Sequence, residues 1–230
     1  MILGAGDGGS AVDVELVRSS LGPLLEGLLL GTLPVTAISF VLGLALALVV
    51  ALMRLSGNRL LSGLSRAYVS VIRGTPLLLQ LFIVFYALPT LGLTIDPFPS
   101  AIIAFTLNVG GYASEAVRAS ILAVPRGQWE AAATVGMGRA TTLRRVVLPQ
   151  ASRIAVPPLS NTLISLVKDT SLASTILVTE LLRKAQEIAA PSFDFFTLYG
   201  VAAVYYWVVC LLLSFGQDGL ETRLSRYVAA

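Results

Sequence analysis

The sequence has 230 residues, of which 56% are hydrophobic and 13% are charged. Soluble domains carry roughly 25% charged residues, so this composition argues against one. Several apolar runs exceed the ~18 residues that mark a transmembrane helix, and the sequence therefore predicts an all-α polytopic membrane protein.

Three absences in the sequence limit its chemistry. There is no histidine, which excludes histidine metal sites and histidine acid–base catalysis. The single Cys210 excludes an intrachain disulfide and is expected to be a packing residue. Neither a G-x-S-x-G nor a G-x-x-x-x-G-K-[ST] motif occurs. If ATP drives an activity of this chain, a partner must supply the energy.

The net charge of +3 follows from cations beside apolar runs and does not indicate nucleic-acid binding.

The apolar runs predict about five transmembrane spans. In chain order they cover about residues 24–53, 67–88, 99–124, 151–167 and 195–215. Residues 1–22 are acidic and lack a basic region followed by an apolar core, so we expect an extracytoplasmic segment without a cleavable signal peptide. The transmembrane domain then covers residues 23–217, and a cytoplasmic tail covers 218–230.

The arginines and lysines predict the orientation, because cytoplasmic loops carry an excess of both. They gather after the first span, after the third span and in the tail: Arg54, Arg59, Arg66, Arg126, Arg139, Arg144, Arg145, Arg223 and Arg226. The N-terminus is therefore expected outside and the C-terminus in the cytoplasm. The fourth connection would place Lys168, Arg183 and Lys184 outside. There the acidic residues, Glu180 among them, are expected to balance these cations, and residues 179–188 to form a short interfacial helix.

Polar residues recur on one face of the third and fourth spans. The third carries Asn108, Tyr112, Glu115 and Arg118; the fourth carries Asn161, Ser165, Lys168 and Asp169, followed by Thr170 and Ser171. Ionisable groups inside a membrane normally face a protein interior or a wet cavity. The two stripes together therefore favour a shared substrate pathway, and their charges of both signs suit a zwitterion.

A structural interpretation of the same stripes stays open. Glu115 with Arg118, and Lys168 with Asp169, would then be local ion pairs that hold helices together. The breakers Gly74-Thr75-Pro76 and Pro157-Pro158 also allow two interpretations. They either distort helices around a cavity or are plain packing kinks.

Residues 126–149 have the character of a soluble amphipathic segment between two spans. Alanines at 131–133, then Gly136 and Gly138, then a basic stretch ending at Pro149 predict a short helix, a glycine turn and a second short helix stopped by proline. Glu130 suits the positive end of the first helix and a docking partner. Binding of the arginines to anionic lipid is the alternative.

The segment EAAATVGMGRATTLRRVVLP at 130–149 resembles the EAA motif of permease subunits of ATP-driven bacterial importers. Val146 stands where the family pattern usually has isoleucine. The stretches RGTP with Gln80, GQWEAAA and PPLSNTLISLVKDTSLASTI resemble the branch for polar amino acids. ALMRLS, DPFPSA, LPQASR and KDTSLA resemble L-cystine permeases most. The part before about Leu21 shows no such likeness.

The resemblance implies the transmembrane domain of a type I ABC importer in the bacterial inner membrane. Its coupling residues would be Glu130, Ala131, Ala132 and Gly136, which dock on the ATPase. It also implies two ATPase subunits that bind ATP and Mg, an extracytoplasmic amino-acid-binding protein and a second permease copy. A homodimer is favoured and a heterodimer stays open. Surrounding lipid is the remaining partner. No catalytic residue, cofactor or metal is expected in this chain.

Other functions remain compatible with the sequence. The same kind of complex carries glutamine, glutamate or basic amino acids in related branches. Two alternatives belong to other functional classes. One is an ATP-independent secondary transporter, and the other is a membrane scaffold or sensor in which the stripes are structural. Five spans without an evident inverted repeat argue against the secondary transporter.

Overall fold

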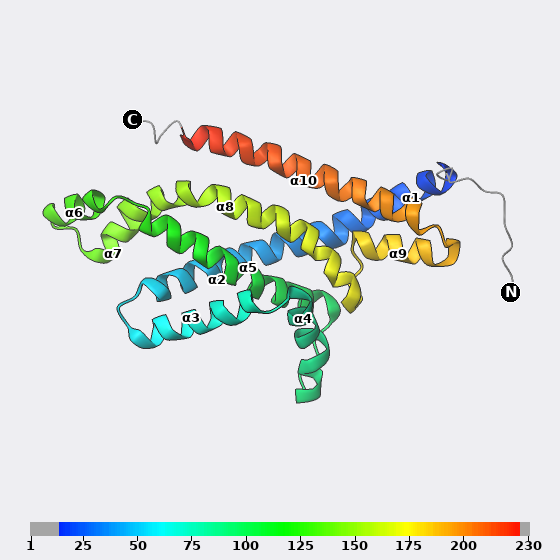
Figure 1. Cartoon of the computed structure of the whole chain (residues 1–230), viewed down its shortest axis with the longest axis horizontal. Coiled ribbons are helices and arrows are strands. Elements are labelled where there is room, and N and C mark those ends of the chain that lie inside the picture. The colour runs from blue at the N-terminus through cyan, green and yellow to red at the C-terminus, as the bar shows by residue number, and fades with distance from the viewer. Residues whose placement is uncertain (1–13, 226–230) are drawn as a thin grey trace.

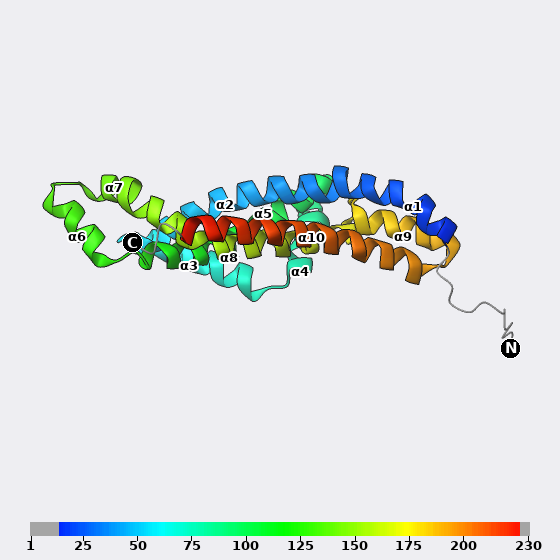
Figure 2. The same cartoon turned by 90° about the horizontal axis from the view of Figure 1, so that it is seen from above.

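The computed structural model describes residues 14–225, so residues 1–13 of the predicted N-terminal segment (1–22) and residues 226–230 of the predicted tail (218–230) lie outside the described residues. Every secondary-structure element in this range is helical. The long helices lie roughly side by side along one axis (Figures 1 and 2). Helices α6 and α7 form one end of the molecule, and α9 with the start of α1 forms the other.

The first long helix contains a π-helical turn at a proline. It consists of α1 (Val14–Gly27), the π-helical η1 (Leu28–Thr32) and α2 (Leu33–Leu55). Pro34 has no N–H to donate to the preceding turn, and the Leu33 N–H bonds to the Leu28 carbonyl instead. The rod therefore continues through Pro34. It begins at Val14, well before the predicted span at 24–53.

The predicted second span at 67–88 is bent and is not one continuous helix. Helix α3 (Arg59–Gly74) is followed by α4 (Leu77–Phe82), the π-helical η2 (Ile83–Ala87) and the 3₁₀-helical η3 (Leu88–Leu91). The two parts meet at an angle of 107°. A residue before proline disfavours the helical conformation, and Thr75 is extended with φ −119 and ψ 145. The break thus follows from Pro76.

Helix α5 (Pro97–Leu122) includes most of the predicted span at 99–124. Its 26 residues extend about 39 Å. It packs closely along α2, and glycines permit this approach. A Cβ on Gly43 would lie 2.5 Å from Val109 Cγ1, and one on Gly110 would lie 2.6 Å from Leu46 Cδ2. These two helices form one packed pair.

The prediction that Pro149 stops a second short helix is wrong. Helix α6 (Arg126–Thr134) is followed by α7 (Arg139–Thr142), the π-helical η4 (Leu143–Val147), α8 (Leu148–Asp169) and the 3₁₀-helical η5 (Thr170–Ile176). From Arg139 onward these elements form one rod. The Leu148 N–H bonds to the Leu143 carbonyl, and Pro149 lies in the first turn of α8. The π-helical turn accommodates it as η1 accommodates Pro34.

The last two helices are α9 (Leu181–Ser192) and α10 (Phe195–Ser225). Helix α9 corresponds to the short helix predicted at 179–188 and packs against α1 and α10. Helix α10 includes the predicted span at 195–215 and continues through residues 218–225, which were predicted as the start of the tail.

Two described helical stretches, Val14–Leu55 and Phe195–Leu224, are long and apolar enough to cross a membrane. Counting each bent pair as one span raises the number to four. Helix α5 is long enough, but polar residues such as Asn108 and Glu115 lower its hydropathy, so the count of five stays a prediction. The loop between α2 and α3, helices α6 and α7, and the end of α10 lie at the same end of the molecule (Figure 1). This arrangement agrees with their common basic character.

Candidate functional site

A cavity of about 420 Å³ lies where α5, α8 and the break after α3 meet. We call it the α5–α8 cavity. Five residues of the two predicted stripes line it: Asn108, Tyr112, Asn161, Ser165 and Asp169. Thr75, Pro76 and Leu77 contribute from the break, and Thr162 adds a further hydroxyl. The break at Pro76 therefore forms part of the same cavity as the stripes.

Gln80 closes the break with hydrogen bonds. Its Nε2 donates to the carbonyl oxygens of Ile72 at 2.8 Å and of Thr75 at 3.2 Å, and to Thr75 Oγ1 at 3.0 Å. Its Oε1 accepts from Asn108 Nδ2 at 3.1 Å. Backbone carbonyls freed by a proline need such partners when they are buried. The sequence analysis named Gln80 only as part of a family resemblance and assigned it no role. The amide in the apolar run LLLQLF, directly after Pro76, could have indicated this role.

One carboxylate lines the cavity, and one cation lies over the ring of another lining residue. Of the described residues that line it, only Asp169 is charged. The guanidinium of Arg73 lies 5.3 Å from the centre of the Tyr112 ring, a cation–π distance. Tyr112 itself is 45% exposed, so the Arg73–Tyr112 pair is partly accessible to solvent. A zwitterion in the cavity would thus have a carboxylate on the α8 side and a positive charge near the α5 side.

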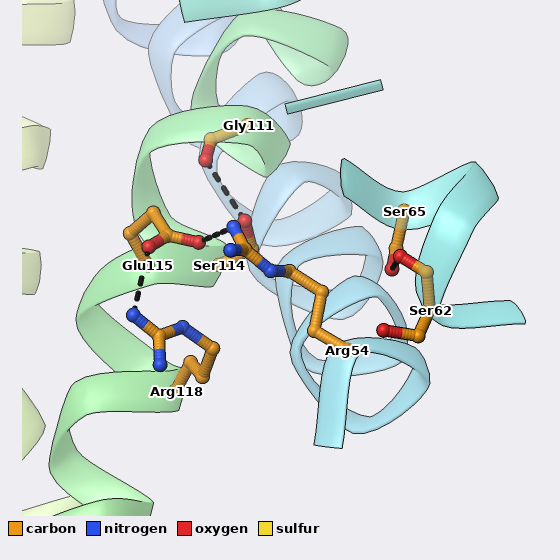
Figure 3. Close-up of polar contacts among 7 residues, drawn as sticks. All are labelled: Arg54, Ser62, Ser65, Gly111, Ser114, Glu115 and Arg118. Atoms are coloured by element: carbon orange, nitrogen blue, oxygen red, sulfur yellow. Dashed lines mark hydrogen bonds and ion pairs between the residues drawn. The ribbon is translucent and has the colours of Figure 1, made fainter. Parts of the chain in front are cut away.

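Glu115 and Arg118 do not line this cavity. Figure 3 shows Glu115 between two arginines, with Arg54 bonded to its Oε1 and Arg118 bonded to its Oε2 at 3.1 Å. The side chains of Arg54, Glu115 and Arg118 are only 20%, 22% and 30% exposed. Arg54 was assigned to a cytoplasmic loop, and its bond across to α5 was missed. The network ties the end of α2 to α5, and a role of Glu115 and Arg118 in the pathway stays a prediction.

The other expected ion pair, Lys168 with Asp169, is absent, because neighbouring residues of a helix point in different directions. Lys168 is exposed and does not line the cavity. Thr170 and Ser171 lie outside it as well. The Thr170 hydroxyl donates to the Val167 carbonyl and the Ser171 hydroxyl to the Lys168 carbonyl, each at 2.7 Å. Three of the predicted pathway residues are therefore placed away from the cavity walls.

Glu180, which was expected to balance the cations of the fourth connection, makes no ion pair with them. It is fully buried and caps α9, accepting from the N–H groups of Leu182 at 2.9 Å and Arg183 at 2.7 Å. The Tyr206 hydroxyl donates to it at 2.7 Å, and the Thr32 hydroxyl lies 3.5 Å away. Buried carboxylates require such partners. This cluster joins η1, α9 and α10.

The predicted coupling residues lie on α6 and in the turn that ends it. Ala132 is 5% exposed and faces the chain, whereas Glu130 and Ala131 are exposed. Gly136 has φ +78, a conformation that glycine adopts without strain, and the Met137 N–H bonds back to the Ala132 carbonyl at 3.0 Å. Among residues 14–225, Glu130 has no ion-pair partner. Its carboxylate is available at the end of the molecule.

No group of three or more acidic, cysteine or histidine residues that could hold a metal ion occurs in residues 14–225. The described polar groups instead form hydrogen-bonding walls and ion pairs. Such groups can bind and release a solute.

Known proteins similar to this chain are transport proteins. Residues 25–226 match the family described as binding-protein-dependent transport system inner membrane component. The L-cystine transport system permease protein TcyB of Bacillus subtilis (strain 168) is 58% identical over 222 residues, which cover 96% of this chain and 95% of the relative. The glutamine transport system permease protein GlnP of Escherichia coli (strain K12) is 36% identical over 214 residues, covering 92% and 97%.

Solved structures show the same arrangement of helices. The crystal structure of an amino acid ABC transporter with histidines has a TM-score of 0.87 at 33% identity, covering 93% of this chain and 99% of that chain. An inward-facing conformation of the MetNI methionine ABC transporter has a TM-score of 0.70 at 20% identity, covering 92% and 97%. The second likeness concerns the fold alone.

Proposed function

The chain belongs to the family of binding-protein-dependent transport system inner membrane components, and from this we propose that it is the permease subunit of an ATP-driven importer for a polar amino acid, L-cystine. The transporter would work by alternating access in the inner membrane. The chain itself would perform no covalent chemistry, and ATP hydrolysis would take place on separate ATPase subunits.

One observation carries the proposed pathway: polar residues of α5 and α8 line a common cavity at the break after α3. Its volume of about 420 Å³ lies within the roughly 300–1,000 Å³ of ligand sites. Asp169 on one side and Arg73 beyond Tyr112 on the other suit the two charges of an amino acid. The broken backbone beside them agrees with irregular structure around a membrane cavity.

The choice of L-cystine rests on the relatives. The identity is 58% with the cystine permease and 36% with the glutamine permease, at similar coverage. An importer for glutamine, glutamate or a basic amino acid is the second candidate. An arginine permease of Bacillus subtilis, ArtQ, is also 36% identical over 202 residues.

We further propose that Glu130, Ala131, Ala132 and Gly136 couple this chain to the ATPase. Glu130, Ala131 and Gly136 are exposed, and helix α6 lies at the end of the molecule (Figure 1), which supports this. A second copy of the chain would complete the permease, because one chain carries both the cavity and the coupling segment. An extracytoplasmic binding protein would deliver the amino acid from the opposite side.

Reconstitution into proteoliposomes tests the proposal. The chain is assembled with its ATPase and binding protein, and uptake of radiolabelled L-cystine is measured with ATP, without ATP and without the ATPase. We expect uptake only when all parts are present. Uptake without the ATPase would make the chain a secondary transporter. If arginine or glutamine stimulates ATP hydrolysis and cystine does not, the proposed substrate is wrong, but the proposal of an ATP-driven importer stands.

A further inference from the structure

The amide of Gln80 has a single orientation that its surroundings allow. Its Nε2 lies near the carbonyl oxygens of Ile72 and Thr75 and near Thr75 Oγ1. Carbonyls only accept, and the Thr75 hydroxyl already donates its proton to the Val71 carbonyl at 2.9 Å. An amide oxygen in this position would face three acceptors. The hydrogen-bond network therefore sets Nε2 toward the break and Oε1 away from it.

This orientation determines that of Asn108. Gln80 Oε1 accepts from Asn108 Nδ2 at 3.1 Å, and a reversed Asn108 would place two amide oxygens against each other. Gln80 is 8% exposed and does not line the cavity, whereas Asn108 does. Among residues 14–225, Asn108 Oδ1 accepts no hydrogen bond from another side chain. Oδ1 is therefore the acceptor that Asn108 can offer to a molecule in the cavity.

The cavity thus has acceptors on two walls. Asn108 contributes an amide oxygen from α5, and Asp169 contributes a carboxylate from α8. An ammonium group donates three hydrogen bonds and accepts none, so it matches both. The nearby cation, Arg73, is held on the ring of Tyr112. The two charged ends of an amino acid therefore meet different parts of the cavity.

We propose that Gln80 is a positioning residue for substrate binding: it fixes the Asn108 amide so that Asn108 Oδ1 and the Asp169 carboxylate together receive the ammonium group of the transported amino acid. This inference rests on the proposed amino-acid transport. Gln80 does not touch the substrate itself. The orientation is transmitted from the carbonyls at the break through Gln80 to Asn108.

A double-mutant cycle on the complete permease–ATPase complex tests it. The variants are Gln80→Met, Asn108→Leu and the double variant, and the readout is the Kd for radiolabelled L-cystine without binding protein. Each single change should raise Kd by roughly tenfold, as expected for losing one hydrogen bond to a charged group. The double variant should show about the same tenfold rise, because both changes remove one oriented acceptor.

Gln217→Met is the matched control. Gln217 bonds to Glu221 near the end of α10 and does not line the cavity, so its replacement should leave Kd unchanged. Independent effects that multiply to about a hundredfold would overturn the positioning role. If Gln80→Met fails to assemble, Asn108→Leu still decides, since it keeps the bonds of Gln80 to the carbonyls. An unchanged Kd for that variant overturns the proposal. If the wild-type complex neither binds nor transports any amino acid, the proposed function is overturned, and this inference with it.

Discussion

At the scale of single residues, the two carboxylates of the predicted stripes have different surroundings. Asp169 lines the α5–α8 cavity, and its neighbour Lys168 does not pair with it. Glu115 is bonded by Arg54 and Arg118 and lies outside the cavity walls. A carboxylate held by two arginines has little remaining capacity for a ligand. We therefore expect Asp169 to act on the solute and Glu115 to hold α2 against α5.

Isosteric replacements of these two carboxylates separate the roles. Glu115→Gln should lower the thermal midpoint of the purified complex, because two largely buried guanidinium groups lose their counter-ion at a cost of about 1–3 kcal/mol. Asp169→Asn should leave the midpoint unchanged and raise the Kd for L-cystine roughly tenfold. Thermal unfolding and ligand binding on the same preparations measure both. A raised Kd for Glu115→Gln at an unchanged midpoint would assign Glu115 to the pathway, as the sequence predicts.

Residue spacing predicted the stripes but not their partners. An interval of four residues places Asn108 with Tyr112, and Asn161 with Ser165, on common helix faces whatever the tertiary structure. Arg54 lies 61 positions from Glu115, and no local rule links them. Glu180 was misjudged for the same reason, since its burial depends on Thr32 and Tyr206 from distant helices.

At the scale of elements, the cavity depends on close packing of α3 against α5. A Cβ on Gly111 would lie 2.6 Å from Ile72 Cγ2, which is closer than real Cβ contacts. Ile72 also provides a carbonyl that Gln80 holds at the break. The separation of these helices therefore fixes the position of the break relative to Asn108.

We expect Gly111→Ala to destabilise the complex by about 1–3 kcal/mol, because the added methyl group overpacks this contact. The compensating variant Ile72→Ala removes Cγ2 and should restore part of the loss when the two are combined. Thermal midpoints of the single and double variants provide the test. Gly63→Ala on α3 is the matched control, since its Cβ would meet nothing within 4 Å. Additive losses in the double variant would argue against the contact.

Prolines explain where prediction of the elements succeeded and where it failed. Pro76 ends a helix because Thr75 before it becomes extended. Pro34 and Pro149 do not, since π-helical turns before them shift the hydrogen bonds by one residue. Hydropathy predicted the long helices, but it could not tell a proline that ends a helix from one that a π-helical turn accommodates, because that difference depends on the neighbouring packing. The same limit hid the 107° bend inside the predicted second span.

At the scale of the whole molecule, the coupling segment and the cavity lie at different places along the long axis. Helices α6 and α7 lie at one end (Figure 1), and the rod from Arg139 to Ile176 runs from there and carries the α8 residues that line the cavity. A displacement of the coupling segment could therefore reach Asp169 through a continuous helical rod. The sequence placed a breaking proline at 149 in this rod. The structure removes that interruption, and the rod physically links the predicted coupling segment to the α5–α8 cavity.

Two glycines in the same turn allow a sharp test of this link. Gly136 has φ +78, whereas Gly138 has φ −66, and a Cβ at either position would meet nothing within 4 Å. Alanine at 136 must therefore adopt a left-handed conformation at a cost of about 1–2 kcal/mol, or change the turn, while alanine at 138 fits. We expect Gly136→Ala to reduce ATP-driven uptake by about fivefold or more while the cystine Kd stays unchanged, because the cavity is untouched. Gly138→Ala should transport like the wild type. Equal uptake by the two variants would show that the shape of this turn does not transmit the movement. An altered Kd in Gly136→Ala would show that the change in the turn also affects substrate binding in the cavity.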